Sequence, residues 1–154
     1  MKRTKILMVC LGNICRSPLA EGILKSKLDS SKFEVASAGT GGYHIGALPD
    51  PRSIAVAEHH GIDITDQRAM KFSAYHFEEF DLIYAMDTAN YNDIVALAIN
   101  DEEKAKVQLI LNASHPNSNN SVPDPYYGGD QGFENIYQML DQACNVIAKK
   151  LQLR

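Results

Sequence analysis

Residues 5–18 read KILMVCLGNICRSP, and this stretch is the part of the chain that decides the fold. Its apolar part, 5–9, has the length and content of a buried β-strand. A loop of small and polar residues follows, and a helix is predicted to open near Pro18. Proline suits a first helical turn, because the N–H that it lacks would have no partner there. The stretch therefore predicts a strand, a tight loop and a helix in direct succession.

The same alternation continues along the rest of the chain. Apolar runs predict further strands at 33–36, 82–85 and 107–111. Helical spacing of apolar residues predicts helices at 19–28, 51–60, 88–99 and 133–151. Strands that alternate with helices imply a parallel sheet with helices on both faces. We therefore expect an α/β fold: one domain over residues 1–154, a three-layer sandwich around a four-stranded parallel sheet.

Composition limits the classes of function. The 154 residues suit one domain, and 45% hydrophobic with 22% charged residues is typical of a globular protein. A net charge of -4 argues against a nucleic-acid partner, and no apolar run approaches the ~20 residues of a membrane span. The first apolar run is also too short for a secretory signal. Three cysteines, an odd number, do not make a disulfide framework, so a reducing, cytoplasmic setting is expected.

The loop after the first strand has the features of an anion cradle. Parallel sheets bind ligands at the carboxyl ends of their strands, where this loop begins. Successive backbone N–H groups can point inward there, and the helix N-terminus adds partial positive charge. Gly12 and Asn13 are the residue types best able to take a left-handed backbone conformation in such a loop. The expected phosphate-binding residues are Leu11, Gly12, Asn13, Ile14, Cys15, Arg16 and Ser17.

Cys10 lies where the base of this cradle is expected. A cysteine near a helix N-terminus and a cation can have a pKa well below its usual value, which makes a thiolate nucleophile available. Arg16 offers a planar fork for two phosphoryl oxygens, and Ser17 can donate its hydroxyl to the sulfur. A cysteine at the end of a buried strand is often only a core residue, but the whole string favours catalysis. A Walker-type nucleotide site is disfavoured, because its Gly-Lys-Ser/Thr ending is absent.

At this point a family resemblance is clear. Residues 9–18, continuing to Ala20 and Glu21, resemble the active-site loop of the low molecular weight protein tyrosine phosphatases, and the likeness extends to 37–40, 80–87 and 124–128. The resemblance implies hydrolysis of phosphotyrosine and small aryl phosphates through a cysteinyl-phosphate, with tyrosine-phosphorylated proteins as partners. It implies no metal and no cofactor, since Arg16 and the loop amides supply charge stabilisation. A monomer or weak homodimer is expected.

The leaving phenolate needs a proton, so a carboxylic acid must face the cradle. Asp124 begins a loop bounded by proline and glycine after the fourth strand, at the same end of the sheet as Cys10. An Asp-Pro pair alone more often only starts a turn. The resemblance assigns Asp124 as general acid, and as base for water in the second step.

The resemblance also implies a set of supporting residues. Asn13, Ser17 and Ser37 match positions that brace the loop with side-chain hydrogen bonds. Family members often carry histidine where this chain has Gln67. Glutamine can still donate to a loop residue, so we expect altered loop rigidity more than lost activity.

Aromatic residues are candidates for the walls of the substrate pocket. Tyr43, Tyr126 and Tyr127 could enclose a phenyl ring and set a depth that favours phosphotyrosine, or they could be ordinary half-buried tyrosines. Related arginine phosphatases typically carry threonine at the position of Ile14, so Ile14 favours tyrosine.

The remaining cysteines differ in what they imply. Cys15 lies five residues after Cys10 in the same loop, and the resemblance implies reversible oxidation in which Cys15 captures oxidised Cys10. A packed loop residue is the alternative. Cys144 lies on the apolar stripe of the last helix and is predicted to be core. The five histidines show no metal-ligand spacing.

Three other functions compete with this prediction. A thiol-dependent arsenate reductase shares such a loop but needs further cysteines after the third strand, and residues 82–91 contain none. A phosphopeptide-binding module would need neither a thiolate nor an acid. A third possibility that the sequence leaves open is a metabolic acid phosphatase that acts on small phosphoesters. Comparing turnover of small substrates with turnover of phosphotyrosine would separate it from a tyrosine phosphatase.

Overall fold

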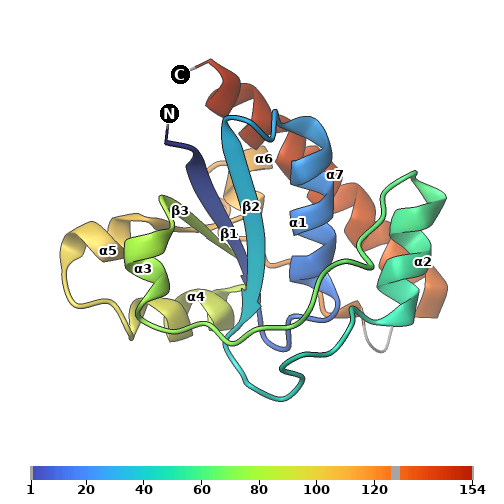
Figure 1. Ribbon diagram of the computed structural model, residues 1–154, viewed down its shortest axis with the longest axis horizontal. Helices are drawn as coiled ribbons and strands as arrows, with labels where there is room; N and C mark the ends of the chain where they lie inside the picture. The colour runs from blue at the N-terminus through green and yellow to red at the C-terminus, as the bar shows by residue number, and fades with distance from the viewer. Residues whose placement is uncertain (1, 126–128, 154) are drawn as a thin grey trace.

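A computed structural model describes residues 2–125 and 129–153 of the chain. Its centre is a four-stranded sheet of order β2-β1-β3-β4, with every neighbouring pair parallel (Figure 1). The strands are β1 Thr4–Cys10, β2 Phe33–Gly39, β3 Leu82–Ala85 and β4 Val107–Leu109. The α/β prediction is confirmed, since β1 lies inside the sheet and pairs with both β2 and β3.

Helices cover both faces of the sheet and make three layers (Figure 1). One face carries α1 Arg16–Lys27, α2 Pro51–His59, α6 Leu111–Ser114 and α7 Gly129–Gln152. The other side carries α3 His76–Glu79, α4 Thr88–Val95 and α5 Asp101–Ala105. Among the described residues, no helix is both long and apolar enough to cross a bilayer.

β1 contributes to the core on both sides of the sheet. Ile6 and Met8 pack into the cluster beneath α1 and α7, whereas Leu7 and Val9 pack into the cluster that includes Phe77 of α3. All four side chains are fully buried. A strand buried on both faces requires a continuous apolar run, and 6–9 supplies one.

Several element boundaries differ from the sequence prediction. β2 continues to Gly39, whereas the predicted strand ended at residue 36. The prediction stopped short because residues 37–39 are small and carry no apolar pattern. α4 ends at Val95; Leu97 and Ile99, which extended the predicted helix, are exposed. β4 ends at Leu109, and α6 begins at Leu111. The short helices α3, α5 and α6 were not predicted.

The carboxyl ends of the strands converge on one edge of the molecule. The loop that joins β1 to α1 and the long segment between β2 and α2 both lie at that edge (Figure 1). The two ends of the chain lie at the opposite edge of the sheet. The candidate site is therefore built where parallel sheets bind their ligands.

Candidate active site

The loop between β1 and α1 curls around the Cys10 sulfur and forms the predicted cradle. Asn13 takes the left-handed conformation with φ 57°, and its N–H donates to Cys10 Sγ over 3.3 Å. Gly12, the other residue suggested for that conformation, does not take it. No side chain caps the start of α1 at Cys15, so the first amides of the helix remain available to an anion.

Gly39 at the end of β2 lets the cradle lie close to the sheet. A Cβ at this position would stand 2.7 Å from the carbonyl oxygen of Leu11 and 3.1 Å from the backbone nitrogen of Asn13. Thr40 N–H donates to the carbonyl of Cys10 over 2.9 Å and fixes the beginning of the loop from the same side. No role of Gly39 could be predicted from the sequence, because the close approach joins segments that are distant in the chain.

A chain of hydrogen bonds with defined donors and acceptors ends on the sulfur of Cys10, a residue that is 3% exposed. Met70 N–H donates to Asn13 Oδ1 over 2.9 Å, which fixes the orientation of that amide. Asn13 Nδ2 must then donate to Ser17 Oγ at 2.8 Å and to Ser37 Oγ at 2.9 Å. Because Ser17 accepts from Asn13, its own proton is free to point at Sγ, 2.9 Å away. The sulfur thus receives a donor from the loop and a donor from the helix.

The bracing residues extend beyond those that the sequence suggested. Ser37 donates to Glu21 Oε1 over 2.7 Å, so a carboxyl of α1 joins the network around Asn13. Gln67 Nε2 donates to the carbonyl of Pro18 over 3.1 Å, so Gln67 supports the start of α1 rather than the loop. Among the residues that the structure describes, its Oε1 has no hydrogen-bond partner.

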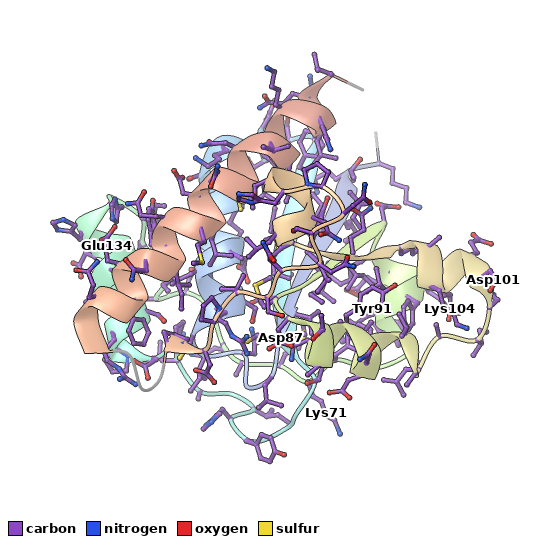
Figure 2. The ribbon with its side chains drawn as sticks, turned by 180° about the vertical axis from the view of Figure 1, so that it is seen from behind. Lys71, Asp87, Tyr91, Asp101, Lys104 and Glu134 are labelled. Atoms are coloured by element: carbon purple, nitrogen blue, oxygen red, sulfur yellow. The ribbon has the colours of Figure 1, made fainter. Side chains whose placement is uncertain are left out.

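Arg16 is buried and held by two acceptors. Its Nη1 donates to Asp87 Oδ2 over 2.7 Å and to the carbonyl of Val122 over 3.0 Å. Asp87 lies at the start of α4 (Figure 2). It is the N-cap of that helix, and its Oδ1 accepts from the N–H of Asn90. Asp87 lies in the stretch 80–87 that carried the family resemblance, but no role was predicted for it; its place between a strand and a helix is the signal that could have found it.

A cavity of about 140 Å³ lies between the cradle and Asp124. It is lined by Cys10, Leu11, Gly12, Ile14, Cys15, Arg16, Tyr43, His44 and Asp124. Val122 N–H donates to the carbonyl of Met86 over 2.8 Å, which ties the segment leading to Asp124 to the end of β3. Tyr43 stands at the mouth and is 76% exposed. Tyr126 and Tyr127 lie outside the described residues.

The two other cysteines are buried free thiols. Burial, together with negative charge at Asp50, Cys10 and Asp124, raises the pKa of Cys15 to about 12. Burial likewise raises the pKa of Cys144 to about 12, and this residue packs in the core of α7 as predicted. Cys15 is therefore a neutral thiol at physiological pH, although it lines the same cavity as Cys10.

The fold and the cradle together define a class: α/β proteins that hold a phosphoryl group between a strand end and a helix N-terminus. Within residues 2–125 and 129–153, no group of three or more histidine, cysteine or acidic side chains is arranged to hold a metal ion.

Comparison with known proteins identifies the family. The model of the family "Low molecular weight phosphotyrosine protein phosphatase" matches residues 5–154. The phosphatase of that description from Schizosaccharomyces pombe is 39% identical over 152 residues, covering 95% of this chain and 96% of its own. The human one is 37% identical over 150 residues, covering 94% of each.

Solved structures agree with this result. A protein tyrosine phosphatase from Entamoeba histolytica superposes with a TM-score of 0.90 at 34% identity, covering 97% of both chains. Wzb from Vibrio vulnificus, solved with benzylphosphonate, gives 0.85 at 30% identity over 97% of this chain and 99% of its own. The chain belongs to the low molecular weight protein tyrosine phosphatase family, and it is a phosphatase.

Proposed function

We propose that the protein hydrolyses phosphotyrosine in proteins, and small aryl phosphates, through a phosphocysteine at Cys10. The observation that carries this proposal is the position of the Cys10 sulfur at the base of the cradle. There it accepts from Asn13 N–H at 3.3 Å and lies 2.9 Å from Ser17 Oγ, in one cavity with Arg16 and Asp124.

In the first step the thiolate of Cys10 attacks phosphorus. The S–P bond forms as the bond from phosphorus to the phenolic oxygen breaks, and Asp124 gives its proton to the leaving oxygen. The cradle amides and the Arg16 guanidinium stabilise the charge on the three equatorial oxygens. Asp87 and the Val122 carbonyl hold Arg16 in place through Nη1, which leaves the rest of its fork for the phosphoryl group.

In the second step water hydrolyses the phosphocysteine. The Asp124 carboxylate takes a proton from the attacking water, a new P–O bond forms, and the S–P bond breaks. Sulfur leaves as a thiolate, and the Ser17 hydroxyl stabilises it through the contact of 2.9 Å. Phosphate then departs, and the site returns to its starting state with no metal taking part.

The lining of the cavity supports an aryl substrate. Leu11, Ile14 and Tyr43 supply apolar surface for a ring in the same cavity as Cys10 and Arg16. The Vibrio vulnificus relative was solved with benzylphosphonate, a phosphonate on a benzyl group, which is consistent with the same preference here.

Turnover of para-nitrophenyl phosphate and of a phosphotyrosine peptide, with and without chelator, tests the proposal. Wild type should turn over both substrates in chelator, and Cys10→Ser should abolish both activities. Asp124→Ala should lower kcat for the peptide by about 10²–10⁴-fold, and less for the nitrophenyl ester, because nitrophenolate leaves readily without a proton. Wild type that binds phosphotyrosine peptide without hydrolysing it would make this a binding module instead.

We also propose that peroxide inactivates the enzyme reversibly, in a reducing, cytoplasmic compartment. Peroxide oxidises the Cys10 thiolate to a sulfenic acid and releases water or hydroxide. The Cys15 sulfur, deprotonated, then attacks the Cys10 sulfur; the S–S bond forms and hydroxide leaves. Both cysteines line one cavity, which supports this step. Peptide mapping after peroxide treatment should find a Cys10–Cys15 disulfide, and irreversible loss of activity without one would contradict the proposal.

A further inference from the structure

A chain of hydrogen bonds runs from the protein surface to the nucleophile, and we call it the brace relay. Its members, in order, are Lys25, Glu21, Ser37, Asn13, Ser17 and Cys10. Lys25 Nζ lies 2.9 Å from Glu21 Oε2, and Ser37 Oγ donates to Glu21 Oε1 over 2.7 Å. The inner contacts, from Ser37 to the sulfur, measure between 2.8 and 2.9 Å. A charged group at the outer end is thus connected to the sulfur without a break.

Glu21 is the member of the relay whose negative charge is destabilised by burial. Its side chain is only 8% exposed, and burial raises the pKa of this carboxyl above its usual value. Hydrogen bonds from Ser37 and Lys25, and the charge of Lys25, oppose that rise, whereas the charge of Asp66 adds to it. Lys25 is the cation in contact with the carboxylate, and its side chain is 47% exposed.

The charge of Glu21 decides where the Ser37 proton points. With a carboxylate at Oε1, the Ser37 hydroxyl donates outward and keeps its lone pairs for Asn13 Nδ2. A protonated carboxyl is a weaker acceptor and can itself donate to Ser37, which competes with Asn13. Gln67 cannot replace Lys25, because it is neutral and its Nε2 donates to Pro18.

We propose that Lys25 is a remote positioning residue of the active site, which keeps Glu21 ionised so that Ser37 and Asn13 hold Ser17 against the Cys10 sulfur. The inference rests on the proposed thiolate mechanism. It assigns a function in catalysis to a half-exposed lysine that touches neither the substrate nor the cradle.

The test compares Lys25→Met, Lys25→Arg and Lys27→Met. Lys27 is the matched control, since it lies on the same helix but pairs with Asp141 of α7 at 2.8 Å. We expect kcat of Lys25→Met at about pH 5 to fall about threefold below wild type, with little change at neutral pH. Without the Lys25 cation the pKa of Glu21 rises further. When the pH is lowered, Glu21 therefore becomes protonated, and activity is lost, at a higher pH than in wild type. Lys25→Arg should restore the profile, and Lys27→Met should match wild type.

A second measurement does not depend on phosphatase activity. The rate at which iodoacetamide alkylates Cys10 at about pH 5, followed by peptide mapping, should fall by a similar factor in Lys25→Met alone. An unchanged pH profile and alkylation rate in Lys25→Met would overturn the inference. So would an equal loss at every pH with a lower Tm, because that pattern indicates damage to α1. An inactive wild type whose Cys10 still shows the Lys25 effect would reject only the proposed function.

Discussion

Cys15 lies beside the nucleophile but differs from it chemically. Cys15 is the N-cap residue of α1 and is 8% exposed. With a pKa raised to about 12 by burial and nearby negative charge, it stays protonated and does not compete with Cys10 for the phosphoryl group. The same property makes it a slow partner for oxidised Cys10.

The rate of disulfide closure should therefore depend steeply on pH. Below a pKa of about 12 the thiolate fraction of Cys15 grows about tenfold for each pH unit, so closure after a peroxide pulse should accelerate by up to that factor. Stopped samples analysed by mass spectrometry measure the rate. Cys15→Ala should form no such disulfide and should accumulate sulfinic acid at Cys10. Closure at one rate across the neutral range would show that Cys15 deprotonation is not limiting.

Helix starts supply much of the site at the scale of secondary structure. α1 presents uncapped amides to the cradle, whereas α4 is capped by Asp87 and α5 by Asn100. The two caps differ in what they hold: Asn100 Oδ1 accepts from Glu103 N–H within its own turn, while Asp87 also accepts from Arg16. Periodicity could not predict α3, α5 or α6, because four or five residues are too few to show a helical repeat.

Substituting each cap in turn separates capping of a helix from positioning of Arg16. Asp87→Asn keeps an efficient N-cap but removes the charge opposite Arg16, so kcat/KM should fall about tenfold. Asn100→Ala should lower the free energy of unfolding by about 1 kcal/mol and leave turnover unchanged. Steady-state kinetics and thermal unfolding of both variants measure the difference. Turnover of Asp87→Asn equal to wild type would show that Val122 alone positions Arg16.

At the scale of the whole molecule, the site depends on residues that meet only after folding. The cradle could be predicted because it is one continuous stretch, and its residues carry their conformational preferences with them. Ser37 comes from β2, Asp87 from the end of β3, and Met70 from the segment before α3. Only the family resemblance pointed to Ser37, and no pattern near Met70 or Gly39 reveals a contact with the cradle. The register of β1 with β2 places Ser37 and Gly39 there, and the bridge between Gly39 and Lys71 brings Met70 to the same edge.

The core cluster on the α7 side contributes to the stability of the whole molecule, and Cys10 packs at its border. Leu140 is fully buried, whereas its neighbour Met139 is 37% exposed. Leu140→Ala should lower the free energy of unfolding by about 2–5 kcal/mol, while Met139→Ala should change it little. Urea unfolding followed by circular dichroism suits a chain that has no tryptophan. Loss of kcat in Leu140→Ala while it remains fully folded would show that the core also sets the geometry of the cradle.

The chain begins before β1 and ends after α7, and both ends lie at the edge of the molecule opposite the cradle (Figure 1). A purification handle, a fluorescent protein or a surface tether attached at either end would therefore project away from the mouth of the cavity. Immobilised in that way, every copy would present its open side to the solution. The protein suits use as an oriented reagent on a bead or sensor chip, where a large phosphorylated substrate must approach from one direction.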